Sequence, residues 1–130
     1  MTQEQKDILL QDLCARLDTN LVCSIYRVDD YGVGYRNEIL SGYCKGDNWY
    51  EFYFGDDCGI GIDDVSKIKP YLIPLSISSM TEEQKEDMVK SSCGIGSDKN
   101  VFDWYNKNHF DYRGLIPMGL AIDATGLNIY

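Results

Sequence analysis

Leucines at helical spacing dominate the first part of the chain. They follow a capping-box pattern at Thr2 and Gln5, and they are Leu9, Leu10, Leu13 and Leu17. The pattern predicts a helix over about residues 3–17. An isolated helix of this length is only marginally stable in water, so we expect its leucine face to pack on a sheet.

Between residues 21 and 75 the pattern changes to short apolar runs separated by turn residues. The strands predicted there cover residues 22–28, 39–44, 49–54 and 60–62. Residues 63–69 are compatible with one helical turn, and Pro70 and Pro74 indicate that residues 71–75 form an edge strand or an extended segment. Short strands joined by tight turns predict a small, curved antiparallel sheet or a partly open barrel of the SH3 or Sm-like kind.

The last third of the chain carries signals for two more helices. Thr81 and Gln84 repeat the capping-box pattern and predict a helix to about residue 91, and a third helix is expected over about residues 99–107. Residues 115–122 are expected to be extended. The predicted fold class is therefore α+β in a single domain of 130 residues, with an N-terminal helix, a small curved sheet and two further short helices.

Composition and charge narrow the possible functions. No apolar run approaches the roughly 20 residues of a membrane span, and the first residues do not resemble a secretory signal, so we expect a cytoplasmic protein without membrane contact. The net charge of −9 disfavours binding of long nucleic acid. Residues 47–64 hold six carboxylates and no Lys or Arg, so an anionic ligand should bind elsewhere.

Catalytic and metal chemistry have little support in the sequence. The five cysteines include no Cys-x-x-Cys pair, which argues against zinc-ribbon and thioredoxin sites and favours reduced thiols. The acidic segment 56–64 does not follow the spacing of a calcium-binding loop, so we predict no metal and no cofactor. One histidine among scattered carboxylates forms no recognisable acid–base set, which makes an enzyme the less favoured class.

The richest segment chemically is 102–114, which holds five aromatic residues, the only histidine and one of the four arginines. One interpretation is structural: Phe102, Trp104 and Phe110 close the core, while Asp111 and Arg113 organise a turn. The other is a binding site, and the two remain open at this stage.

The binding interpretation names specific side chains. Tyr105, His109 or Tyr112 would stack on a planar ligand, and Arg113 would hold an anionic group with two hydrogen bonds. Backbone N–H groups around Gly94, Gly96 and Ser97 would add donors for a phosphate at the start of the third helix, although the segment lacks the lysine of a P-loop.

Several segments resemble a family of small uncharacterised proteins carried by gut Bacteroidales and their phages. The resemblance rests on residues 12–17, 71–83, 104–116 and 118–124, and it departs from the family at Ile73, where a basic residue is expected. The family has no assigned activity, so no functional residue is transferred. The resemblance implies an origin in a phage or another mobile element.

These observations predict a non-catalytic small binding protein in the cytoplasm of a bacterial host. One form is the sequestration of a small nucleotide-type immune signal, a counter-defence role. The alternatives are a protein-interaction module that adds the strand near residues 71–75 to a host protein, and a small hydrolase of unknown substrate. The exposed tyrosines expected among the ten in the chain make a homo-oligomer reasonable.

Overall fold

The computed structural model describes residues 1–29, 32–55, 60–75, 80–91 and 97–130. The first element is α1 (Gln3–Ala15), which begins with the predicted capping box: the Thr2 hydroxyl accepts from the Gln5 N–H at 3.1 Å, and the Gln5 side chain accepts from the Thr2 N–H at 3.0 Å. The helix ends two residues earlier than predicted. Turns that place Asp18 and Asn20 at positive φ follow it.

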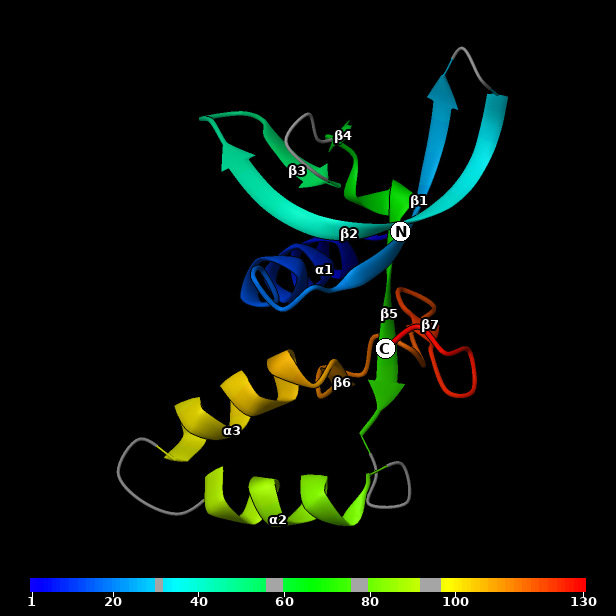
Figure 1. Ribbon diagram of the computed structural model, residues 1–130. Helices are drawn as coiled ribbons and strands as arrows, with labels where there is room; N and C mark the ends of the chain where they lie inside the picture. The colour runs from blue at the N-terminus through cyan, green and yellow to red at the C-terminus, as the bar shows by residue number, and fades with distance from the viewer. Residues whose placement is uncertain (30–31, 56–59, 76–79, 92–96) are drawn as a thin grey trace.

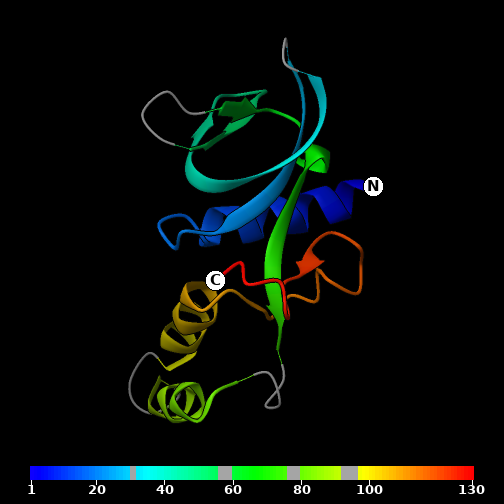
Figure 2. The ribbon, with the colours of Figure 1, turned by 45° about the vertical axis from the view of Figure 1, so that its right-hand side comes forward.

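Seven strands form one curved, mostly antiparallel sheet, and they are β1 (Val22–Asp29), β2 (Gly32–Lys45), β3 (Tyr50–Phe54), β4 (Ile60–Ile62), β5 (Ile68–Pro74), β6 (Phe110–Asp111) and β7 (Ile122–Asp123). Among the residues that the structure describes, the strand order is β4-β3-β2-β1-β5-β6, with β7 also paired to β5. The pairs of β5 with β6 and with β7 are parallel, and the other described pairs are antiparallel. The sheet curves strongly without closing (Figure 1, Figure 2). The α+β class and the curved sheet are confirmed.

Strand β2 is much longer than predicted, because the sequence analysis missed residues 32–38. These residues include two glycines and three polar or charged side chains, which are weak strand formers. Residues 32–38 adopt a strand conformation because each of them pairs with a residue of β1, from Gly32 opposite Asp29 to Glu38 opposite Cys23. A register shift at Ser41 then bends β2 toward β3, as β-bulges do.

The expectation that residues 71–75 lie at a sheet edge is wrong. Strand β5 pairs with β1 through residues 68–70, with β7 through 71–72 and with β6 through 73–74. Pro70 and Pro74 each lack an N–H, but Ile73 between them still donates to the His109 carbonyl at 2.8 Å. Each partner pairs with only two or three residues of β5, and the strand can therefore include both prolines.

Three shorter helical elements complete the fold. The turn predicted after β4 is the 3-10 helix η1 (Val65–Lys67), and α2 (Glu82–Ser91) and α3 (Ser97–Lys107) confirm the two predicted C-terminal helices. The capping box of α2 is present, because Thr81 and Gln84 exchange hydrogen bonds of 3.0 and 3.1 Å. Helices α2 and α3 lie side by side at the end of β5 away from the β1–β2 hairpin (Figure 1, Figure 2).

Of the segment 115–122 that was predicted to be extended, residues 115–121 form turns and bends, and only the last residue is in a strand, β7. The Asp111 carboxylate accepts from the N–H groups of Leu115 and Ile116 at 2.8 and 2.9 Å. Gly119 then adopts a positive φ of 76°, and the Leu120 N–H donates back to the Leu115 carbonyl at 3.0 Å. This is the hydrogen-bond pattern that ends many helices, and it requires a residue such as glycine at the left-handed position.

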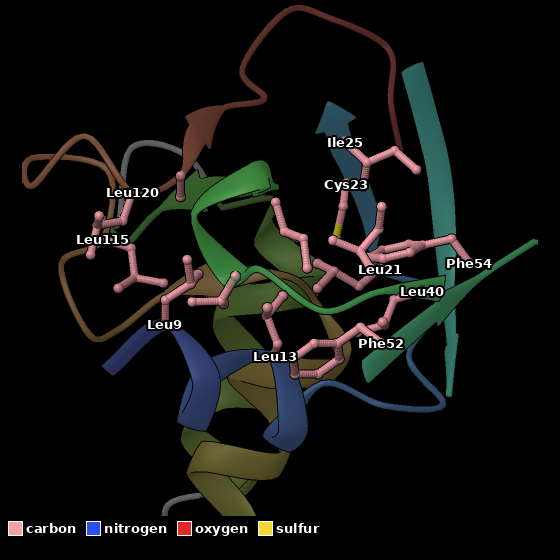
Figure 3. Packing of buried hydrophobic residues seen from close by; sticks show 14 of the residues in the cluster. Leu9, Leu13, Leu21, Cys23, Ile25, Leu40, Phe52, Phe54, Leu115 and Leu120 are labelled. Atoms are coloured by element: carbon pink, nitrogen blue, oxygen red, sulfur yellow. The ribbon is translucent and has the colours of Figure 1, made fainter. Parts of the chain in front are cut away.

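The core lies between α1 and the sheet and receives side chains from the turns after β6 (Figure 3). Leu9 and Leu13 of α1 are fully buried, as the leucine pattern predicted. They share one apolar cluster with Leu21, Cys23, Ile25, Leu40, Phe52, Phe54, Ile62, Val65, Ile68, Leu72, Leu115, Leu120 and Ala121. None of the helices within the described ranges is long and apolar enough to span a bilayer.

The packing predicts a large difference between two leucine truncations. Leu13→Ala removes a side chain with no exposed surface and should lower the free energy of unfolding by about 2–5 kcal/mol. Leu75→Ala changes a side chain that is 39% exposed and should cost less than about 1 kcal/mol. Urea unfolding of both variants measures this, and equal losses would contradict the described core.

Candidate functional site

The structure brings together part of the predicted site. Tyr105 lies on α3, His109 follows that helix, and Tyr112 and Arg113 follow β6. Gly94 and Gly96 lie outside the described residues. Ser97 is the first residue of α3, and the position of its side chain is also outside the description.

Three rings pack against one another on the surface beside α3. The ring centroids of Tyr105 and Tyr112 lie 5.6 Å apart with their planes 28° apart, and Phe102 lies 5.1 Å from Tyr112. Phe102 is 47% exposed, so the expectation that it closes the core is wrong. Phe102, Tyr105, Tyr112 and Arg113 are called the aromatic surface below.

Arg113 is held in place from two sides. Its Nη1 donates to the Asp12 carboxylate at 2.8 Å, and its guanidinium lies 4.6 Å from the centroid of the Tyr112 ring. About 25% of the side chain remains exposed. The arginine predicted to hold an anion is thus already paired with a carboxylate. Of the two residues predicted to organise a turn, Asp111 does so through its bonds to the N–H groups of Leu115 and Ile116, whereas Arg113 bonds to Asp12 instead.

Sequence reasoning missed the buried pair beneath this surface. Asp12 and Arg16 have no exposed side-chain area, and Arg16 Nε donates to Asp12 at 2.9 Å. Arg16 Nη2 also donates to the Phe110 carbonyl at 2.6 Å, and the guanidinium lies 5.4 Å from the Tyr112 centroid. The spacing of four residues between an acid and an arginine on a helix was the available signal.

His109 is a buried structural residue in this geometry. It follows the end of α3 with a positive φ of 63°, a position that is more often glycine. Its ring stacks on Tyr130 with centroids 3.7 Å apart and planes 10° apart. Burial, together with the positive charge of Arg16, lowers the pKa of His109 to about 4, so the ring is neutral at pH 7.

Tyr130 is itself anchored by its hydroxyl group. The hydroxyl donates to the Tyr71 carbonyl at 2.7 Å and accepts from the Val22 N–H at 3.0 Å. The His109 ring is therefore held by stacking on Tyr130, although its buried Nδ1 has no hydrogen-bond partner among the described residues, and His109 does not join the aromatic surface as a stacking group.

The cysteines of the described segments show no activation. Cys14, Cys23 and Cys44 are free, and burial raises the pKa of the first two thiols, which disfavours the reactive thiolate. Cys58 and Cys93 lie outside the described residues. Within the described ranges, no group of three or more histidine, cysteine or acidic side chains is arranged to hold a metal ion.

Two cavities lie away from the predicted ligand residues. One of about 480 Å³ is lined by residues that include Asp18 and Glu38, and another of about 400 Å³ is lined by Ile73 and by residues 124–126 and 128–130. Neither includes Tyr105, Tyr112 or Arg113. Small-molecule sites are usually concave, and neither of these two hollows is formed by the aromatic surface.

Comparison of the chain with protein-family models, curated proteins and solved structures finds no match. The function is therefore argued from the geometry of the described residues.

The buried pair predicts a strong and specific stability effect. Arg16→Met removes the buried partner of the Asp12 carboxylate, which keeps only the partly exposed Arg113, and should lower the free energy of unfolding by about 3 kcal/mol. The double variant Asp12→Leu/Arg16→Met removes both charges and should be more stable than Arg16→Met. Lys85→Met, which breaks an exposed pair with Glu82, is the control and should cost under about 1 kcal/mol. Denaturant unfolding checks the order, and a double variant less stable than the single would contradict it.

The neutral His109 predicts a pH dependence of stability. The unfolded chain takes up a proton on His109 near its ordinary pKa of 6.5, whereas the folded chain does so only near pKa 4. The free energy of unfolding should therefore fall as the pH is lowered from about 6.5 toward 4. His109→Asn, which tolerates a positive φ, should lose this component. Unfolding curves of the wild type and His109→Asn at several pH values test this. Equal changes of the free energy of unfolding with pH in the two proteins would contradict a lowered pKa of His109.

Proposed function

We propose that this protein is a non-catalytic binding protein whose aromatic surface docks on a partner protein. The observation that carries the proposal is the exposed Phe102 packed at 5.1 Å on Tyr112, beside a guanidinium that is one quarter exposed. Tyrosine and arginine are enriched among the residues that carry binding energy in protein interfaces.

The chemistry of this surface suits protein recognition. Asp12 holds Arg113, and Arg113 lies over Tyr112, so binding orders few additional side chains. Groups already held in position cost less conformational entropy when a partner arrives. An exposed group of large rings can offer a wide contact area to another protein.

The same geometry supports a binding role over catalysis. The neutral His109 is buried against Tyr130, and the Cys14 and Cys23 thiols are disfavoured as thiolates. General acid–base and nucleophilic catalysis need such groups within reach of a substrate. We place the partner in a bacterial host, in line with the phage or mobile-element origin that the family resemblance implies.

Sequestration of a small nucleotide-type immune signal is the second candidate. Its support is the stacked pair of Tyr105 and Tyr112 next to the Arg113 guanidinium. Stacking of a base offers about 1–3 kcal/mol, whereas micromolar affinity needs about 8 kcal/mol. One copy of the aromatic surface is therefore short of donors for a tight nucleotide site, which is why we rank a protein partner first.

A matched affinity experiment tests the first candidate. The wild-type protein, Phe102→Ala and Leu127→Ala are used as baits in host extract, and retained proteins are quantified by mass spectrometry. Phe102 and Leu127 are 47% and 51% exposed, so both truncations should leave the fold intact. A partner retained by the wild type and Leu127→Ala, but reduced at least about tenfold by Phe102→Ala, is expected because the lost ring is a central contact.

Native mass spectrometry with a panel of cyclic nucleotides separates the alternatives. An intact adduct that is lost in Arg113→Gln would favour sequestration over a protein partner. Recovery of a chemically altered nucleotide would identify an enzyme and overturn the binding proposal. If no bait retains a protein that depends on Phe102, the docking proposal fails.

A further inference from the structure

Residues 125–130, called the strap below, leave β7 in a loop and return to β5 (red in Figure 1 and Figure 2). In the part of the chain that the structure describes, the hydrogen bonds of residues 125–129 reach only Asp123 and Ala124, which immediately precede the strap. The cavity of about 400 Å³ lies between the strap and Ile73. The strap is therefore joined to the sheet mainly through its last residue, Tyr130.

The Tyr130 hydroxyl lies between two strands at the point where their pairing ends. The described pairing of β1 with β5 ends at Cys23 opposite Pro70, so Val22 and Tyr71 would form the next pair. The Val22 N–H instead donates to the Tyr130 hydroxyl at 3.0 Å, and this hydroxyl donates to the Tyr71 carbonyl at 2.7 Å. One oxygen atom thus fastens the strap to both strands.

The Tyr130 ring also separates His109 from solvent. The two rings stack with centroids 3.7 Å apart, and His109 is 9% exposed whereas Tyr130 is 47% exposed. The backbone of His109 is fixed, because its N–H donates to the Asn106 carbonyl and its carbonyl accepts from the Ile73 N–H. Tyr130 is thus a neighbour of His109 that can move away without breaking a backbone pair of the sheet.

The surroundings of His109 favour its uncharged form while the strap is closed. Arg16 Nη2 donates to the carbonyl of Phe110, the residue after His109, and the buried Nδ1 of His109 has no hydrogen-bond partner among the described residues. A proton on the His109 ring would place a second cation beside Arg16, and it would leave a buried N–H donor without an acceptor. Water can reach the charged ring only if a covering group moves.

The acidic groups on neighbouring elements are already bonded. Asp12 on α1 holds two arginines. Asp111 on β6 and Asp123 on β7 each accept from backbone N–H groups of the turn that follows. The other ionisable groups on these elements are uncharged in acid or lie exposed on α3, and they are Cys23, Tyr71, Tyr130, Asp103 and Lys107. Within the described residues, Arg16 is therefore the charged group that acts on the His109 ring.

We propose that acid releases the strap: when the His109 ring takes up a proton, residues 125–130 detach from the sheet as one unit while the core stays folded. Detachment gives the charged ring access to water, and it frees the Val22 N–H and the Tyr71 carbonyl. Segments held by few contacts open locally at a lower free energy than the whole fold. Because protonation and opening are coupled, each promotes the other to the same extent.

Proton NMR of the wild type gives the first test, since His109 is the only histidine and its Cε1 proton gives a single signal. As the pH is lowered from 7, the methyl signals of Leu127 and Ile129 should move with the same midpoint as the His109 signal, near its pKa of about 4. The methyl signals of the fully buried Leu13 should keep their positions through this transition. Strap signals that stay in place while His109 titrates, or that change only together with Leu13, would contradict the proposal.

Opening the strap by substitution tests the coupling at a pH where the core is stable. Tyr130→Ala removes both the stacked ring and the hydroxyl, so the midpoint of the His109 titration should rise by about one pH unit or more. Tyr130→Phe keeps a ring that can stack but loses both hydrogen bonds, and it should give a smaller rise. Leu127→Ala changes an exposed residue of the same strap and is the matched control, with an unchanged midpoint.

An unchanged His109 midpoint in Tyr130→Ala would overturn the inference. The Leu13 methyl signals report whether each variant is folded, and if Tyr130→Ala does not fold, the midpoint of Tyr130→Phe decides in its place. The inference is independent of the proposed partner binding, because Phe102→Ala should titrate as the wild type does.

Discussion

The buried guanidinium of Arg16 is the interaction on which the rest of the structure depends. It joins α1 to a carbonyl 94 residues later, at Phe110, while its own helix supplies the counter-charge from Asp12. A charge without exposed surface needs such partners, and Nε and Nη2 of Arg16 have them, whereas the buried Nη1 has none among the described residues. The position of β6 relative to α1, and with it the geometry of Tyr112 and Arg113, therefore follows from one salt bridge and one hydrogen bond.

That interaction also decides what kind of binding surface results. Asp12 serves two arginines, so Arg113 is held rigidly but has a carboxylate beside it. A ligand anion would compete with that carboxylate, whereas a protein partner gains from rings and a guanidinium already in place. His109 is also not part of this surface, because its ring packs on Tyr130.

The bend of β2 at Ser41 separates two surfaces of the molecule. Before the bend β2 pairs with β1 and leaves an open edge, and after it β2 pairs with β3. The hairpin and α3 lie far apart in both views (Figure 1, Figure 2).

The sequence by itself determined the elements with local signals: the capped helices, the runs 22–28 and 49–54, the buried Leu13 and the α+β class. It missed residues 32–38, whose strand conformation comes from β1, and it placed residues 71–75 in an edge strand or an extended segment, although β7 and β6 pair with residues 71–74. Segment 102–114 was identified as chemically rich, but whether its arginine was available depended on Asp12, about a hundred residues earlier in the chain. Local propensity and capping act over a few residues, whereas pairing partners and counter-charges are chosen by packing between distant segments, and only the tertiary structure decides them.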